Sequence, residues 1–266
     1  MDLMRHWIDS EAILLTEGIS DETITEAELD NLVKAADILA NNNLNSHKAQ
    51  VLYERALKGQ SRLLGENNIK IYDTITNYAK LLDENDGHHS PKIFELYEKA
   101  LSGYERLVGT SSSQYLSALN NLAVFHSKAH KFKEAKKLFI EALEGFKKLK
   151  GDGDTTTLMI STNLANIEEE LGHYDQAKVL YMSALQSQEY HLGMKHIDTL
   201  RTAYNLAKLY EKTEDYMSAI PLFQRAYEGL EQIQGKSSEV SSAAKNSYQL
   251  CINKSGSQFE TGIHKI

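Results

Sequence analysis

One pattern of small and large residues recurs along this chain at a nearly constant spacing. In its clearest copy the marks are Asn121-Leu122-Ala123, Ala135, Leu138-Phe139, Ala142-Leu143 and Gly151. The same marks return 42 residues later from Asn163 and again from Asn205, and a weaker copy lies 44 residues upstream from Asn77. A fixed period with the same residues in phase is the signature of stacked repeats, in which each unit packs mainly on its neighbours. The chain is therefore expected to form an array of repeats, without one central core.

Each period divides into two amphipathic helices separated by a short polar turn. The first helices are expected over residues 25–42, 68–84, 112–128, 154–170 and 196–212. The second helices are expected over residues 46–64, 90–108, 132–150, 174–192 and 216–234. A leading helix over 2–17 precedes these pairs, and a closing helix over 238–252 covers the last apolar face, as a solenoid requires. The prediction is an all-α fold, a right-handed α-solenoid.

The chain is expected to have three parts: a capping segment (1–24), five helix pairs (25–236), and a closing helix with a short polar tail (237–266) that frays from Asn253. Only 2 prolines and 15 glycines in 266 residues favour long helices. No apolar run approaches the roughly 20 residues that a membrane helix needs, and the N-terminus lacks the basic region of a secretory signal. With a single cysteine, Cys251, these features predict a cytoplasmic protein without membrane insertion.

The net charge of −8 comes entirely from the start of the chain. Residues 1–45 hold ten acids against Arg5 and Lys34, and the remainder holds 27 acids and 27 bases. A protein that holds nucleic acid through phosphate contacts needs an excess of basic residues. The neutral repeats therefore argue against a nucleic-acid scaffold, and the lysines over 128–150 are interpreted as a solvated helix face.

The recurring residues resemble the tetratricopeptide repeat family. Asn-Leu-Ala, the aromatic residue that begins the second helix, the single alanine and Ala-Leu all have that family's spacing. The longer period, with Leu64-Gly65, Leu192-Gly193 and Pro221-Leu222-Phe223, is similar to the repeats of kinesin light chains. The resemblance covers residues 46–235 best and implies a protein-interaction fold that serves many different partners.

The resemblance also implies a binding groove. In that family the first helices line a concave groove, and the asparagine of Asn-Leu-Ala bonds the backbone of a bound peptide, since an amide offers both a donor and an acceptor. The alternative is that these asparagines link one repeat to the next. The expected groove residues are Asn77, Lys80, Asn120, Asn121, Val124, Thr162, Asn163, Asn166, Arg201, Tyr204, Asn205 and Lys208.

The groove charge suggests what kind of peptide binds. Arg201, Lys208 and Lys212 make the C-terminal end basic, so we expect a partner with an acidic segment there. The lip of the groove is expected to hold Asp83, Lys128, Glu169 and Lys212. A second hypothesis is that the segment around Trp7 occupies the groove of its own or a neighbouring molecule; the alternative is that Trp7 packs as a cap.

No catalytic arrangement is evident, and no cofactor or metal is expected. His126 and His130 are four residues apart, but no glutamate follows His126 as the zinc-protease pattern requires. His88-His89 lies near three acids, which is interpreted as a solvated turn in preference to a metal site. Cys251 has no adjacent histidine to activate it and is expected to be a small buried side chain.

The sequence therefore predicts a non-enzymatic scaffold or adaptor that binds a peptide or protein segment in its groove. Three alternatives stay open: a regulatory receptor whose superhelical pitch changes when a signalling peptide binds, a subunit that self-associates into an oligomer, and an enzyme with an unrecognised site. The oligomeric state, the partner and the pathway cannot be read from the residues.

Overall fold

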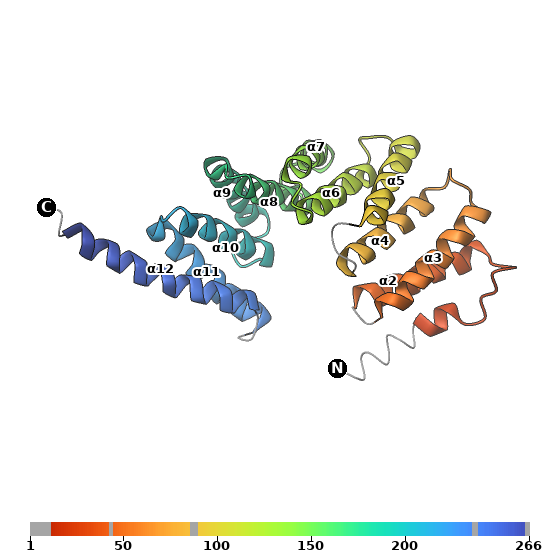
Figure 1. Ribbon diagram of the computed structural model, residues 1–266, viewed down its shortest axis with the longest axis horizontal. Coiled ribbons are helices and arrows are strands. Elements are labelled where there is room, and N and C mark those ends of the chain that lie inside the picture. The colour runs from red at the N-terminus through yellow and green to blue at the C-terminus, as the bar shows by residue number, and fades with distance from the viewer. Residues whose placement is uncertain (1–11, 43–44, 86–89, 236–238, 264–266) are drawn as a thin grey trace. The chain divides into compact units, whose positions relative to one another are not determined.

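The computed structural model describes residues 12–42, 45–85, 90–235 and 239–263, and these residues form helices joined by short turns (Figure 1). A short helix over 12–16 leads the described chain. The longer helices are α2 (Glu26–Asn41), α3 (Ser46–Leu63), α4 (Ile69–Asn85), α5 (Pro91–Val108), α6 (Ser113–Lys128), α7 (Phe132–Lys150), α8 (Thr155–Glu170), α9 (Tyr174–His191), α10 (Ile197–Lys212), α11 (Tyr216–Gln234) and α12 (Glu239–Ile263). The bounds of α2 to α11 agree with the expected ones to within one residue.

The chain divides into two compact units, named here unit 1 (Met1–Leu138) and unit 2 (Phe139–Ile266). Within unit 1, each helix from α2 to α6 contacts the next along the chain. Within unit 2, the same holds from α8 to α12. First helices of adjacent repeats also meet, α2 with α4 and α4 with α6 in unit 1, and α8 with α10 in unit 2. Packing between sequence neighbours confirms the expected all-α solenoid.

The alanines of the repeat pattern set how closely the helices pack. At the positions of the Asn-Leu-Ala alanine and of the single alanine that follows it, every alanine is fully buried: Ala36, Ala49, Ala79, Ala123, Ala135, Ala165, Ala177, Ala207 and Ala219. A larger side chain in a well-packed helix interface forces the helices apart. The recurrence of these alanines is therefore explained by packing, and it carries no information about a ligand.

The turn within each of the last three helix pairs ends in a left-handed residue. His130, Gly172 and Glu214 have φ angles of 57°, 78° and 61°, and each lies 42 residues after the one before. The amide of the following residue bonds a carbonyl in the last turn of the first helix, as Lys131 does to His126 at 2.8 Å. This is the Schellman arrangement, which normally takes glycine at the left-handed position.

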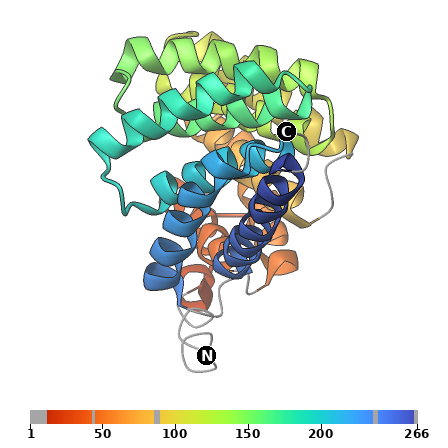
Figure 2. The ribbon, with the colours of Figure 1, turned by 90° about the vertical axis from the view of Figure 1, so that its left-hand side faces the viewer.

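The closing helix is longer than expected. α12 continues to Ile263, whereas a frayed tail was expected from Asn253. The side chains of Ser241, Ala244, Cys251 and Ser255 are buried, and their spacings of three, seven and four residues place them in one stripe along the helix. α12 lies beside α11 and also contacts α10, so the small residues of this stripe let a long helix cover the last repeat (Figure 2).

Candidate functional site

The first helices of adjacent repeats in unit 2 form a cleft of about 220 Å³. α8 and α10 provide its walls, α9 contributes Gln188, and the residue that follows α9 contributes Leu192. The lining residues are Thr155, Met159, Thr162, Asn163, Asn166, Gln188, Leu192, Asp198, Arg201, Thr202 and Asn205. Five of the expected groove residues are thus brought together in one place: Thr162, Asn163, Asn166, Arg201 and Asn205.

A hydrogen-bond network joins three helices at this cleft. The Tyr181 hydroxyl on α9 donates to Oδ1 of Asn166 on α8, and Nδ2 of Asn205 on α10 donates to the same oxygen at 3.1 Å. Burial and the neighbouring Glu169 raise the pKa of Tyr181, so its hydroxyl stays protonated and remains a donor. Asn205 therefore links one repeat to the next, which was the alternative interpretation of the Asn-Leu-Ala asparagines.

Asn163, which holds the same position one repeat earlier, does not link two repeats. Asn163 is half-buried at the cleft and makes no side-chain hydrogen bond within the described chain. The network also uses only the oxygen of Asn166, which leaves its Nδ2 group as a donor at the cleft. Both amides can therefore pair with a peptide backbone without breaking any hydrogen bond of the fold.

Gln188 is a lining residue that the repeat pattern did not single out. Its side chain is 2% exposed, and Nε2 donates to Thr162 at 3.3 Å. Its Oε1 has no hydrogen-bond partner among the described residues. Buried carbonyl oxygens are almost always paired in native proteins, so this oxygen, itself buried, is a point at which the described fold is incompletely satisfied.

The basic residues expected at the end of the groove are not equivalent. Lys208 pairs with Glu211 at 2.9 Å, and Lys212 pairs with Glu169 at 3.3 Å. Arg201 is exposed, lines the cleft, and forms no ion pair within the described chain. Of the three, Arg201 is the cation available to a ligand.

The lip residues pair with one another across repeats. Lys128 on α6 reaches Asp83 on α4 at 2.7 Å, in the same arrangement as Lys212 and Glu169. Asp83 is buried, with only 5% of its side chain exposed. These pairs connect neighbouring first helices and are explained by the fold alone.

The remaining expected groove residues lie elsewhere. On α6, Asn120 is only 8% exposed, and neither Asn121 nor Val124 lines a described cleft. Tyr204 packs edge-on against Phe223, with ring centroids 5.7 Å apart. Their part in ligand binding stays a prediction.

Two further expected groove residues lie on α4 in unit 1. Nδ2 of Asn77 donates to Asp37 at 3.1 Å, so this asparagine also links two repeats. Lys80 is exposed and lines a hollow of about 210 Å³ with Asp37, Tyr53 and Glu84.

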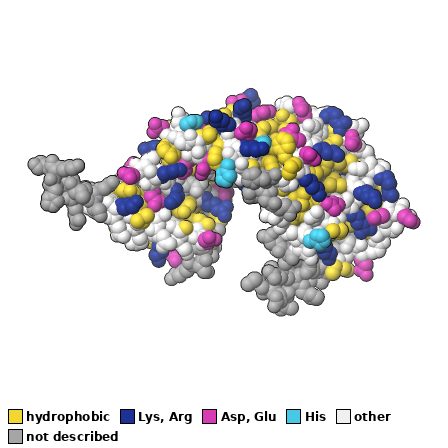
Figure 3. All heavy atoms as spheres, in the orientation of Figure 1, with side chains coloured by type: hydrophobic (Ala, Val, Ile, Leu, Met, Phe, Trp, Pro, Cys, Tyr) yellow, Lys and Arg dark blue, Asp and Glu magenta, His cyan; other side chains and the backbone are white. Residues whose placement is uncertain are grey.

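Charges of both signs are mixed on the visible face (Figure 3). Among the described residues, no cluster of three or more metal-ligating side chains is found, and His88-His89 lies outside them. The segment around Trp7 also lies outside the described residues. Cys251 is fully buried, as expected, and burial raises the pKa of its thiol. None of the described helices is long and apolar enough to span a membrane.

The family profile for the tetratricopeptide repeat matches residues 114–189 and again 156–232, which covers both walls of the unit 2 cleft. Residues 114–232 are tetratricopeptide repeats. No curated protein matched its sequence.

Solved structures of other proteins share this fold. BtubC (BKLC) from P. vanneervenii aligns with a TM-score of 0.69 at 22% identity, covering 89% of this chain and 92% of BtubC. A Podosopora anserina protein with nearly identical kinesin-light-chain TPR-like repeats aligns with a TM-score of 0.66 at 17% identity, covering 77% and 96%. A Rap protein complexed with Competence and Sporulation Factor aligns with a TM-score of 0.63 at 14% identity, covering 95% and 75%.

Proposed function

We propose that this protein is a non-enzymatic scaffold that binds an extended peptide segment in the cleft between α8 and α10. The observation that carries the proposal is the set of unengaged amide groups at that cleft. Asn163 and Nδ2 of Asn166 offer donors and an acceptor that the described fold does not use. Backbone amides of an extended chain carry both complementary groups, so such a cleft holds a peptide largely independently of its side chains.

Arg201 adds a preference for charge. It is the unpaired cation of the cleft, so an acidic side chain or a carboxylate on the peptide forms a charge-assisted hydrogen bond with it. We expect the preferred peptide to place aspartate or glutamate next to Arg201. The complex of a Rap protein with Competence and Sporulation Factor supports ligand binding by a protein of this fold.

The test is panning of a random peptide library, displayed on phage, against the whole protein. Peptides that are enriched are then synthesised, and their affinities are measured by fluorescence polarisation for the wild type and for Asn163→Ala. Because Asn163 makes no hydrogen bond in the described fold, its replacement should weaken binding about tenfold with an unchanged melting temperature. Asn246→Ala, an exposed asparagine on α12, is the matched control and should bind like the wild type.

Unchanged affinity of Asn163→Ala for every enriched peptide would place binding elsewhere, and the absence of enriched peptides would refute the scaffold proposal. The receptor and oligomer alternatives are separated by two further measurements on the same samples. Small-angle scattering with and without an enriched peptide reports compaction, which the receptor requires and a rigid scaffold does not. Sedimentation equilibrium reports the mass, which the oligomer raises above that of one chain.

A further inference from the structure

Unit 1 contains a cleft built on the same plan. α2 and α4 form its walls, α3 contributes Gln60, and its volume is about 450 Å³. Its lining residues are Asp30, Asn31, Val33, Lys34, Asp37, Gln60, Lys70, Asp73, Thr74 and Asn77. The volume lies within the range of about 300–1,000 Å³ that is usual for ligand sites.

The two clefts correspond residue by residue in the phase of the repeats. The offset is 129 residues between α2 and α8, and 128 residues both between α3 and α9 and between α4 and α10. The matched pairs are Asp30 with Met159, Val33 with Thr162, Lys34 with Asn163, Asp37 with Asn166, Gln60 with Gln188, Lys70 with Asp198, Asp73 with Arg201, Thr74 with Thr202, and Asn77 with Asn205.

The hydrogen-bonded centre is the same in both clefts. The Tyr53 hydroxyl and Nδ2 of Asn77 both donate to Oδ1 of Asp37, as Tyr181 and Asn205 do to Asn166. Gln60 is 1% exposed, and its Oε1, like that of Gln188, has no hydrogen-bond partner among the described residues.

The glutamine marks these two repeats. The same position in the other repeats carries Tyr104, Phe146 and Leu230, all of them buried and none needing an outside donor for a carbonyl oxygen. Tyr104 instead donates to Asp73 at 2.7 Å. Both glutamines with an unpaired carbonyl line a cleft between two first helices. In each cleft the hydrogen-bonded centre also contains a tyrosine and an aspartate or asparagine.

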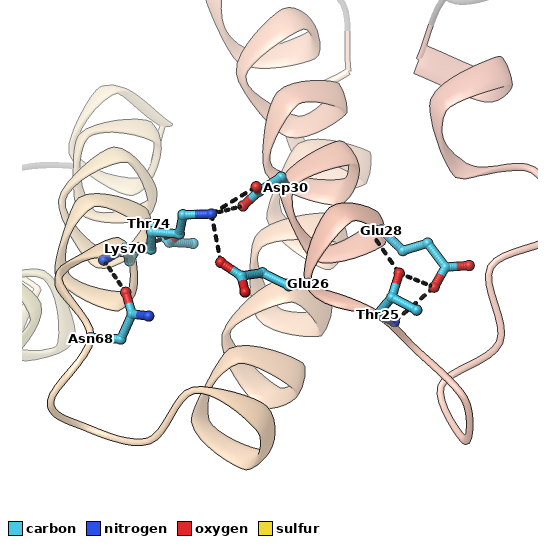
Figure 4. Close-up of polar contacts among 7 residues, drawn as sticks. All are labelled: Thr25, Glu26, Glu28, Asp30, Asn68, Lys70 and Thr74. Carbon is cyan, nitrogen blue, oxygen red and sulfur yellow. Dashed lines mark hydrogen bonds and ion pairs between the residues drawn. The ribbon is translucent and has the colours of Figure 1, made fainter.

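The clefts differ in charge. Asp37 has a second carboxylate oxygen where Asn166 has an N–H group, and Asp73 is exposed where Arg201 stands in unit 2. Lys70, the cation nearest to Asp73 along α4, is held by Asp30 at 2.8 Å and Glu26 at 2.9 Å on α2 (Figure 4). Lys34 on α2 is exposed and also lines the unit 1 cleft, so Asp37 and Asp73 there face one cation that makes no described ion pair. The unit 2 cleft presents amide donors and Arg201 beside a single carboxylate, that of Asp198.

We propose that the unit 1 cleft is a second, independent peptide site, which selects a segment carrying lysine or arginine opposite Asp37 and Asp73. This inference rests on the proposed function and extends it: one chain binds two peptide segments of opposite charge preference. Charge complementarity decides the choice, because a cation gains charge-assisted hydrogen bonds at Asp73 while an acidic side chain meets two carboxylates.

The experiment uses the same displayed random peptide library, with Asp73→Asn and Arg201→Gln as the two baits compared with the wild type. Asp73→Asn removes the charge but keeps an oxygen that accepts from Tyr104, so the helix packing is retained. We expect two classes of peptide. Basic peptides should bind Asp73→Asn about tenfold more weakly and Arg201→Gln unchanged, and acidic peptides should show the reverse.

A single acidic class that responds only to Arg201→Gln would overturn the second site and leave the proposed function standing. A library that yields no binders overturns both.

Discussion

The unpaired carbonyl of Gln60 predicts a substitution that raises stability. Gln60 is 1% exposed, and leaving a buried acceptor without a partner costs about 1–3 kcal/mol. Methionine has a similar length and no group that needs a hydrogen bond, so Gln60→Met removes this cost, and imperfect packing offsets less than about 1.5 kcal/mol of the gain. We expect the free energy of unfolding to rise by about 1–2 kcal/mol.

Gln188→Met provides the internal comparison. Gln188 also donates to Thr162 at 3.3 Å, and losing that bond costs about 0.5–1.5 kcal/mol. The gain at Gln188 should therefore be smaller than the gain at Gln60, close to zero. Gln176→Met, at an exposed position on α9, should stay within about 0.5 kcal/mol of the wild type.

The measurement is urea and thermal unfolding followed by circular dichroism. For a chain of this size, each 1 kcal/mol corresponds to a shift in melting temperature of about 2–4 °C. A loss of 1 kcal/mol or more in Gln60→Met would refute the reasoning, since it would mean that Gln60 is satisfied in the folded protein and serves its stability.

Three further predictions follow from other contacts. Lys128→Met should lower the free energy of unfolding by about 1–2 kcal/mol, because its ion-pair partner Asp83 is 5% exposed while Lys128 remains partly in solvent. Urea unfolding compared with Lys137→Met, at an exposed lysine, checks this prediction, and equal stability of the two variants would contradict it. Burial, with a contribution from Lys131, lowers the pKa of His126 below its ordinary 6.5. As the pH drops below about 6.5 the unfolded chain takes up the proton first, so the stability of the folded protein should fall. His126→Leu should lose less stability over this pH range, and parallel pH profiles of the two proteins would be evidence against the explanation. Glu214→Gly should raise stability by about 0.5–1 kcal/mol by relieving a φ of 61°, and Gly172→Ala, at a φ of 78°, should lower it by about 1 kcal/mol; thermal unfolding of both variants tests the pair, and shifts of the same sign would exclude the explanation.

The period of the sequence determined the helices and part of the cleft. Helix bounds follow from the spacing of apolar and turn residues, and residues three or four apart on one helix share a face. Asn163 and Asn166 on one helix, and Arg201 and Asn205 on another, could therefore be assigned to the lining from sequence alone.

Only the tertiary structure decided which asparagines of the Asn-Leu-Ala position make no hydrogen bond and between which first helices a cleft forms. Asn77 and Asn205 are tied to Asp37 and Asn166, 40 and 39 residues away, and no local pattern shows such a bond. The glutamines lie on second helices, whose lining role depends on how three helices meet. A signal for them was present, since Gln60 and Gln188 interrupt a column of large buried residues, but its meaning depends on packing between helices that are distant in the sequence.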